Sequence, residues 1–342
     1  MKGVTLMSDK YYDITIIGGG PVGVFAAAYA KMRQAKVQVI ESLDQLGGQV
    51  AALFPAKKIY DIPGYPVITG TDLVKNLVDQ AEQFNPEFYL AETVQQIHQE
   101  NKFFKLITSK RTTFTKAIII ATGVGAFQPR RLNLPEASQF ENNQLRYFIK
   151  DPNEFSGKDL IIAGGGDSAV DWALDLMPKA KSLHIVHRRN KFRALESNVA
   201  KLKETDAVIE TPFLIDKITP SDQQRIKVTL KEVRGTQQKE IEADYLLVNY
   251  GIVSNNKYLK NWNLAVQHGL ISVNSEMETA IPGIYAIGDV TNYNGKLNLI
   301  AAGFGEAPIA VNNALLELYP DRRQPMHSTQ LVKALPKSEH FN

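Results

Sequence analysis

The sequence predicts an α/β protein built from two Rossmann-like dinucleotide-binding folds. The first observation is residues 14–41, where an apolar run, a glycine-rich turn, an alanine-rich helical pattern and a second apolar run follow one another. The second is that the same order recurs over residues 159–187. Strand, glycine turn, helix and strand in this order form the βαβ unit that binds a dinucleotide. At 342 residues the chain has room for about two such domains.

The first unit contains the pattern Gly18-x-Gly20-x-x-Gly23 and ends in Glu41. Gly18 permits a tight turn, Gly20 lets the backbone approach a pyrophosphate, and Gly23 lets the helix pack closely on the strand. The N-terminus of the following helix offers free N–H groups to the phosphates. Glu41 can accept hydrogen bonds from both hydroxyls of a ribose. The alternative, a glycine loop without a nucleotide, leaves the complete order of elements unexplained.

In the second unit Gly164, Gly166 and Ala169 take the positions of the three glycines. The two residues after Gly166, Asp167 and Ser168, are expected at the helix N-terminus beside the pyrophosphate of a second dinucleotide.

The two units differ in charge where their second strands end. The offset between the glycine motifs brings Glu41 into register with His187, which Arg188 and Arg189 follow. Cations suit the 2′-phosphate of NADP, and an arginine binds a phosphate with two parallel hydrogen bonds. We therefore expect an NADP site that includes His187 and the arginines 188, 189 and 193. A basic solvated turn is the alternative.

Composition excludes several other classes of protein. A formal net charge of +3 argues against nucleic acid as the main partner. The absence of cysteine excludes disulfides, thiolate metal sites and a redox dithiol, and we expect no metal. No apolar run approaches the ~18 residues that a membrane span requires, and the N-terminus lacks the apolar core of a signal peptide. We expect a cytoplasmic protein without membrane contact.

The stretches between the motifs give further expectations. The loops around Gln49, Phe54 and Tyr65 are candidates to line the ring end of the first cofactor; a surface excursion is the alternative. Asp289 follows an apolar strand and Gly288, and either binds a ribityl hydroxyl or caps a turn.

The remaining segments predict ordinary elements. We expect a helix at 71–84, antiparallel strands at 88–97, 103–108 and 111–115, and a buried strand at 116–123. A β-meander is expected within 208–248. Residues 303–308 are expected to open a helix at 309–318, whose positive end can stabilise negative charge on a reduced flavin.

These motifs together resemble the two-domain flavoprotein disulfide reductases, thioredoxin reductase in particular. The pair Cys-x-x-Cys of those enzymes is missing, because residues 145–151 contain no sulfur. The chain is more similar to the bacterial thioredoxin-reductase-like ferredoxin–NADP⁺ reductases. The resemblance covers essentially the full length, and its motifs lie at residues 18–23, 45–49, 164–173, 186–194, 303–308 and 325–329.

The resemblance implies a fold and two cofactors, FAD and NADP(H). The FAD domain is discontinuous and comprises residues 1–124 and 254–342, with the NADP domain, residues 125–253, inserted. The C-terminal tail covers the flavin across a homodimer. Hinge rotation is expected near residues 123–127 and 249–254.

The resemblance also assigns residues. His327 covers the flavin ring, Ser328 bonds its N5, and Phe54 stacks where similar sequences have tyrosine, so that a hydroxyl is lost. The positions that contact FAD are Glu41, Gln49, Phe54, Val94, Phe127, Asp289, Ser328 and Thr329.

The implied activity is electron transfer from NADPH through FAD to ferredoxin or flavodoxin. An acidic ferredoxin would fit Lys57, Lys58, Arg130 and Arg131, although solvated surface is the alternative for these charges. Reduction of a small disulfide, a quinone or oxygen is the rival activity, and a non-catalytic nucleotide sensor is a remote one.

Overall fold

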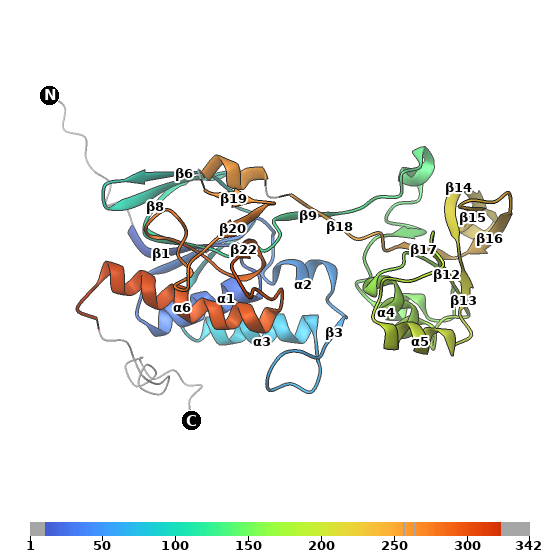
Figure 1. The fold of residues 1–342 in the computed structure, drawn as a ribbon, viewed down its shortest axis with the longest axis horizontal. Helices are drawn as coiled ribbons and strands as arrows, with labels where there is room; N and C mark the ends of the chain where they lie inside the picture. Colours follow the sequence, from blue (N-terminus) through green and yellow to red (C-terminus); the bar gives the residue numbers. More distant parts are fainter. Residues whose placement is uncertain (1–10, 256, 263, 323–342) are drawn as a thin grey trace. The chain divides into compact units, whose positions relative to one another are not determined.

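The computed structural model describes residues 11–255, 257–262 and 264–322, which divide into two compact units (Figure 1). Unit 1 contains the described residues up to Ala126 and from Ser254 onward, and unit 2 contains Phe127–Val253. The segments that connect them, β9 (Ala126–Pro129) and β18 (Ile252–Asn255), pair as a two-stranded sheet.

A seven-stranded sheet forms the centre of unit 1. Its strands β5, β2, β1, β8 and β21 are parallel to their neighbours, whereas β6 and β7 continue from β8 as antiparallel strands. The bounds are β1 (Tyr11–Ile17), β2 (Val37–Ile40), β5 (Glu87–Tyr89), β6 (Val94–Glu100), β7 (Phe103–Thr108), β8 (Thr112–Ile120) and β21 (Ile284–Ala286).

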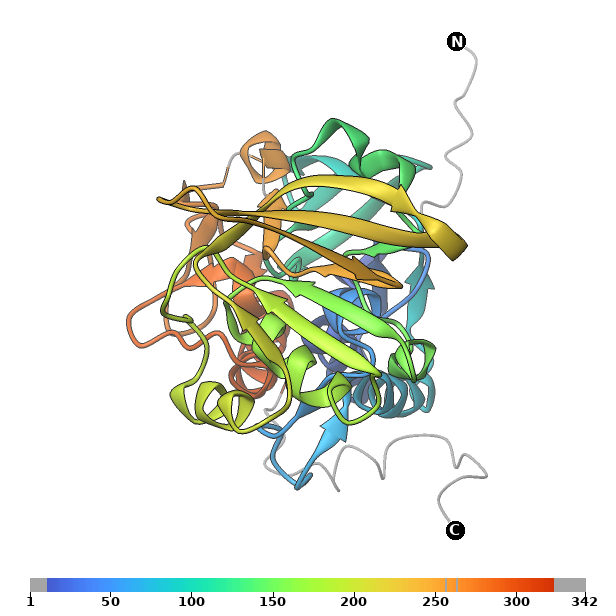
Figure 2. The same ribbon diagram turned by 90° about the vertical axis from the view of Figure 1, so that its right-hand side faces the viewer.

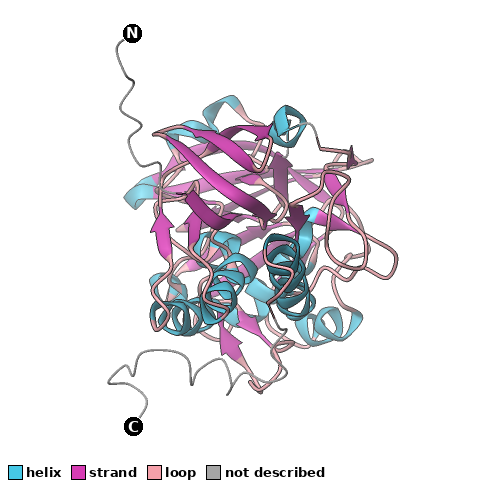
Figure 3. Cartoon of the chain, turned by 90° about the vertical axis from the view of Figure 1, so that its left-hand side faces the viewer, coloured by secondary structure: helices cyan, strands magenta, loops and turns pink. Residues whose placement is uncertain are grey.

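The two faces of this sheet pack against different elements because side chains alternate along each strand. Ile14 and Ile16 belong to the core shared with α1 (Pro21–Met32) and α6 (Ile300–Leu318). Ile17 belongs to the core on the other face, with Trp262. The helix α3 (Gly70–Glu82) packs on α1, and α1, α3 and α6 lie on one side of the strands of unit 1 (Figure 1). In Figure 3 the longer helices lie in the lower half of the view, below most of the strands.

Short elements complete unit 1. They are α2 (Gly48–Leu53), β3 (Lys58–Ile59), β4 (Ile68–Thr69), η4 (Lys257–Trp262), β19 (Val266–Gln267), β20 (Leu270–Ser272), η5 (Gly288–Val290) and β22 (Thr291–Asn292).

Unit 2 has a parallel sheet in the order β10-β17-β11-β12-β13 and a three-stranded antiparallel sheet, β14-β15-β16. Figure 2 shows the antiparallel sheet lying over the parallel one. Buried apolar residues of both sheets form one core. Helices α4 and α5 flank the parallel sheet. The bounds are β10 (Leu145–Arg146), β11 (Asp159–Ala163), α4 (Asp167–Leu176), β12 (Ser182–Val186), α5 (Glu196–Lys203), β13 (Val208–Glu210), β14 (Phe213–Ser221), β15 (Arg225–Glu232), β16 (Gln238–Ala243) and β17 (Tyr245–Val248), with short 3-10 turns η1 (Pro135–Gln139), η2 (Pro152–Phe155) and η3 (Asp222–Gln224).

Three expectations about elements were wrong. The expected strand at 88–97 is two strands: β5 pairs parallel with β2, and β6 pairs antiparallel with β7. The expected strands at 111–115 and 116–123 are one continuous strand, β8. The last helix begins at Ile300 rather than at 309, so Pro308 lies within it rather than near its start. Burial of this segment against α1 and the sheet outweighs the weak helix propensity of its glycines and proline.

Candidate functional site

The carboxyl ends of three parallel strands meet at one edge of the unit 1 sheet. The Ala121 N–H donates to the carbonyl of Ile17 (2.8 Å), and the Ile287 N–H donates to the carbonyl of Ile120 (2.9 Å). These bonds place the turns after β1, β8 and β21 side by side. Ligands of open α/β sheets bind at this edge.

The first glycine turn uses its glycines in three different ways. Gly18 has a φ of +110°, and a Cβ on it would lie 2.4 Å from the carbonyl oxygen of Ala121. A Cβ on Gly23 would lie 2.0 Å from the carbonyl oxygen of Gly18. Gly20 has ordinary angles, φ −69° and ψ 177°, and a Cβ on it would meet nothing within 4 Å. The fold itself therefore requires the first and last glycines but not Gly20.

Gly20 is also the N-cap of α1, and no side chain caps that helix. An uncapped helix N-terminus beside an open glycine fits the pyrophosphate of a dinucleotide, because the N–H groups and the helix dipole both favour an anion.

The second glycine-rich loop lies directly against the first. The Gly47 N–H donates to the carbonyl of Gly19 (2.8 Å), and a Cβ on Gly48 would lie 3.0 Å from the Cα of Gly20. The half-buried Gln49 follows in the first turn of α2. Residues 45–49 thus form a second wall of the same site.

Phe54 ends α2 and is half-buried, with the Lys57 ammonium 5.8 Å from its ring centre. The following loop, Tyr60–Pro66, forms a shallow hollow lined by its own residues, and Tyr60 and Tyr65 are exposed.

Glu41 orders the glycine turn. Its carboxylate is buried and accepts hydrogen bonds from the Gly19 N–H (2.5 Å), the Leu43 N–H (2.8 Å) and the Ser42 hydroxyl (3.0 Å). A carboxylate has about four acceptor positions. One further donor, such as a ribose hydroxyl, can therefore be accepted without loss of these bonds.

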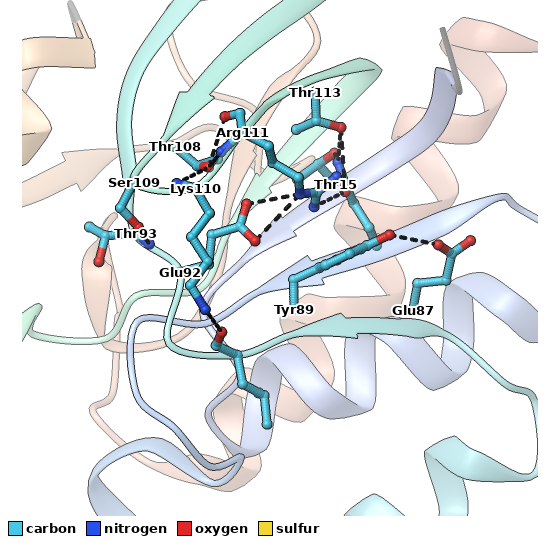
Figure 4. A network of polar contacts seen from close by, with 12 residues as sticks. Thr15, Glu87, Tyr89, Glu92, Thr93, Thr108, Ser109, Lys110, Arg111 and Thr113 are labelled. Atoms are coloured by element: carbon cyan, nitrogen blue, oxygen red, sulfur yellow. Dashed lines mark hydrogen bonds and ion pairs between the residues drawn. The ribbon is translucent and has the colours of Figure 1, made fainter. Parts of the chain in front are cut away.

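A largely buried polar network around Arg111, Glu92 and Tyr89 adjoins the Glu41 segment; Figure 4 shows these three residues. The Arg111 guanidinium donates to Glu92 (3.0 Å) and to Gln38 (2.8 Å), and lies 3.6 Å from the ring centre of Tyr89. Glu92 in turn donates its backbone N–H to the Glu41 carbonyl (2.9 Å). The members of this network lie far apart in sequence and no motif marks them, so none of these contacts could be predicted from the sequence.

Asp289 lies in η5, directly after Gly288, whose φ is +73°. Burial raises the pKa of the Asp289 carboxyl, the charge of Lys296 lowers it, and the charge of Glu306 raises it again. This turn thus places a partly desolvated carboxyl group, that of Asp289, at the same sheet edge as the glycine turn.

The other residues expected at FAD are distributed differently. Val94 begins β6 and is buried in the core. Phe127 lies in β9, and its side chain is outside the description. His327, Ser328 and Thr329 lie outside the described residues.

The glycine turn of unit 2 repeats the geometry of the first. A Cβ on Gly164 would lie 2.5 Å from the Asn249 carbonyl oxygen, whereas a Cβ on Gly166 would meet nothing within 4 Å. Gly166 is the N-cap of α4, without a side-chain cap, and Asp167 and Ser168 form the first turn. This turn also fits a pyrophosphate.

His187 lies beneath this turn. A Cβ on Gly165 would come within 2.3 Å of the imidazole, which stacks on Phe192 with ring centres 5.3 Å apart. Burial lowers the pKa of His187 below its ordinary value; a hydrogen bond with the Lys191 backbone raises it, and the charges of the nearby arginines lower it again. The ring therefore packs as a neutral group and contributes no positive charge at pH 7.

The arginines remain available at the surface. Arg188, Arg189 and Arg193 are exposed. The Arg193 N–H donates to the Gly165 carbonyl (2.7 Å), so the basic loop folds back onto the glycine turn. A second hydrogen bond holds the basic loop against the glycine turn: the Leu195 N–H donates to the Asp167 carboxylate (2.9 Å).

The family model for pyridine nucleotide-disulphide oxidoreductase matches residues 12–314. The chain belongs to this family. It is 52% identical over 337 residues to a ferredoxin–NADP reductase of Ligilactobacillus salivarius, which covers 97% of this chain and 99% of the relative. A ferredoxin–NADP reductase of Halalkalibacterium halodurans is 51% identical over 325 residues, 94% of this chain and 98% of the relative.

Solved structures of thioredoxin reductases share the fold. The Lactococcus lactis enzyme has a TM-score of 0.74 at 29% identity, covering 89% of this chain and 97% of its own. The T. acidophilum thioredoxin reductase has a TM-score of 0.77 at 25% identity, covering 91% of this chain and 99% of its own. These findings confirm the resemblance, the two Rossmann-like folds, the class of oxidoreductase and the cofactors FAD and NADP(H). No helix in the described part of the chain is long and apolar enough to cross a bilayer.

Proposed function

We propose that the protein is a ferredoxin–NADP reductase, a flavoenzyme that passes electrons between NADPH and ferredoxin. The observation that carries the proposal is a pair of uncapped glycine turns with opposite charge at their strand ends, in a chain without cysteine. Without cysteine, the dithiol chemistry of thioredoxin reductases has no route here. The relatives named ferredoxin–NADP reductase support the same activity.

Unit 1 is proposed to hold FAD. Gly20 and the α1 N-terminus receive the pyrophosphate, Glu41 accepts from a ribose hydroxyl, and Asp289 bonds the ribityl chain. Bound FAD supplies the redox chemistry, by accepting a hydride from NADPH and releasing electrons one at a time. The chain binds and orients the flavin, and no side chain has to transfer a proton in the hydride step.

Unit 2, residues 127–253, is proposed to hold NADP(H). Gly166 and the α4 N-terminus receive the pyrophosphate, and Arg188 and Arg189 bind the 2′-phosphate, with Arg193 beside them. His187 supports the turn from beneath.

The isoalloxazine ring of FAD would lie at the end of the site away from the glycine turn. Gln49 and Phe54 would line the flavin on one side, and His327 and Ser328 of the tail would cover it across a homodimer. By the family resemblance, three further positions would contact FAD: Val94, Phe127 and Thr329.

Ferredoxin is the proposed partner, with flavodoxin as a further acceptor and a cytoplasmic location. Lys57 and Lys58 belong to unit 1, whereas Arg130 and Arg131 belong to unit 2, where Arg131 pairs with Glu141 (3.1 Å). Each pair of cations is proposed to contribute to docking of an acidic protein surface.

The test is an anaerobic stopped-flow assay of the FAD-loaded protein with NADPH and a panel of acceptors. Ferredoxin or flavodoxin should be reduced with a kcat/KM far above that for small disulfides, quinones or oxygen. Rapid flavin reduction without transfer to either redox protein would contradict the proposed acceptor. A purified protein that neither contains nor rebinds FAD would contradict the activity as a whole.

A further inference from the structure

Glu306 is a charged side chain in the interior of unit 1. It lies on the helix α6 and is 3% exposed. One carboxylate oxygen accepts the Gly288 N–H (2.6 Å), and the other accepts the Tyr293 hydroxyl (2.7 Å) and the Lys296 ammonium (2.5 Å). The carboxylate thus links α6 directly to the turn that presents Asp289.

Lys296 is buried together with Glu306. The two side chains are 8% and 4% exposed, and the ammonium also lies 5.5 Å from the Tyr293 ring centre. A buried ion pair of this kind gives little net stability compared with apolar side chains, but removal of one partner leaves an uncompensated charge. Its position therefore calls for an explanation other than general stability.

The position of the pair is at the proposed flavin site. The same turn that donates to Glu306 contains Asp289, and Lys296 and Glu306 both shift the pKa of Asp289, in opposite directions. A Cβ on Gly303 would lie 2.4 Å from a Val22 methyl group, so α6 also packs tightly on the first turn of α1. The pair is therefore built into the contact between the two cofactor-facing turns of unit 1.

We propose that Lys296 and Glu306 are positioning residues for FAD. Glu306 fixes the orientation of the Gly288–Asp289 turn, and Lys296 compensates the negative charge of Glu306, so that Asp289 does not lie beside a second unpaired carboxylate. This inference rests on the proposed FAD site. Glu306 sets the turn through the Gly288 N–H, and Lys296 neutralises Glu306. Neither residue has to touch the flavin.

The experiment measures FAD binding to the full-length apo-protein by quenching of flavin fluorescence, together with the thermal stability of the apo-protein. Lys296→Met should raise the FAD dissociation constant by about tenfold or more, because it leaves a buried carboxylate without its cation. The double variant Lys296→Met/Glu306→Gln leaves no buried charge and retains an acceptor for the Gly288 N–H. It should recover most of the lost affinity.

The matched control is Lys116→Met. Lys116 also binds a carboxylate and a tyrosine hydroxyl, those of Asp13 (2.9 Å) and Tyr319 (2.8 Å). It lies on β8 four residues before Ile120, roughly 13 Å before the sheet edge at ~3.3 Å per residue. It should lower thermal stability and leave FAD affinity within about twofold.

The outcomes separate the inference from the function. An unmodified protein that binds FAD, combined with a folded Lys296→Met variant of unchanged FAD affinity, overturns the inference alone. So does a double variant as weak as the single one, or an equal loss of affinity in Lys116→Met. Failure of the unmodified protein to bind FAD at all overturns the proposed function instead.

Discussion

The preference for NADPH over NADH provides the sharpest test of unit 2. Arg188 and Arg189 are exposed, and they follow the strand end where His187 packs as a neutral ring. In the proposed NADP(H) site, these two arginines would therefore supply the positive charge for the 2′-phosphate. The change to test is Arg188→Ala/Arg189→Ala.

The magnitude follows from the exposure of these side chains. A hydrogen bond to a charged group contributes about 1.5–3 kcal/mol. Solvent screening at an exposed site reduces this, so we expect about 2–3 kcal/mol for the two arginines together. That corresponds to a loss of roughly 30- to 150-fold in kcat/KM for NADPH.

The assay is steady-state reduction of a ferredoxin or an artificial acceptor, with each nicotinamide varied in turn. NADH lacks the 2′-phosphate, and its kcat/KM should change by less than about threefold. Arg234→Ala is the matched control, because Arg234 is another exposed arginine of unit 2, between β15 and β16. Equal losses for NADPH and NADH would refute the assignment, as would an equal loss in the control.

Three further predictions follow from contacts of the described residues. Gly20→Ala and Gly166→Ala should leave the free energy of unfolding of the apo-protein unchanged or raised by about 0.5 kcal/mol, since neither Cβ meets an atom within 4 Å. They should nevertheless weaken FAD and NADPH binding respectively, whereas Gly23→Ala should destabilise the fold; calorimetry and titration distinguish these cases. Because burial lowers the pKa of His187 below 6.5, the unfolded chain binds more protons just below that pH, and stability should fall as the pH falls from about 6.5. His187→Phe should reduce the difference in melting temperature between about pH 7.5 and about pH 5.5, and an unchanged difference would contradict the neutral ring. Arg111→Met should lower the free energy of unfolding in urea by about 3 kcal/mol, because its carboxylate partner is buried, and a loss below about 1 kcal/mol would count against the network.

The sequence was sufficient for the parts of the fold that depend on local pattern. The glycine turns and the strands around them have a period and an order that few other folds share, and the repeated unit expected at 159–187 is formed by β11, α4 and β12. Elements whose stability comes from burial were harder to predict. Residues 303–308 contain two glycines and a proline and were expected only to open a helix at 309–318, yet residues 300–308 form the first half of α6, which packs against α1 and the sheet.

The buried polar contacts could not be predicted for a related reason. Gln38 stands in a short apolar run and resembles a solvent-facing residue of a half-exposed strand. It is fully buried and hydrogen-bonded to Thr15 (2.8 Å) and Thr113 (3.0 Å), residues that are close only after the sheet has formed. The pair of Lys296 and Glu306 is hidden in the same way, because each residue alone has the composition of surface.

The two proposed nucleotide sites have a structural feature in common, although the charges at their strand ends differ. Glu41 and His187 occupy equivalent positions in the two units. Each contacts the residue between the first two glycines of its motif: Glu41 accepts a hydrogen bond from the Gly19 N–H, and the His187 ring packs against Gly165. Support of the glycine turn is therefore the property that both positions have in common. A carboxylate supports the turn and still has an acceptor for a ribose hydroxyl, whereas a neutral ring supports it and offers no charge. Discrimination between the two dinucleotides in unit 2 then has to come from the residues that follow, which is why the arginines rather than the histidine should determine the choice of NADPH.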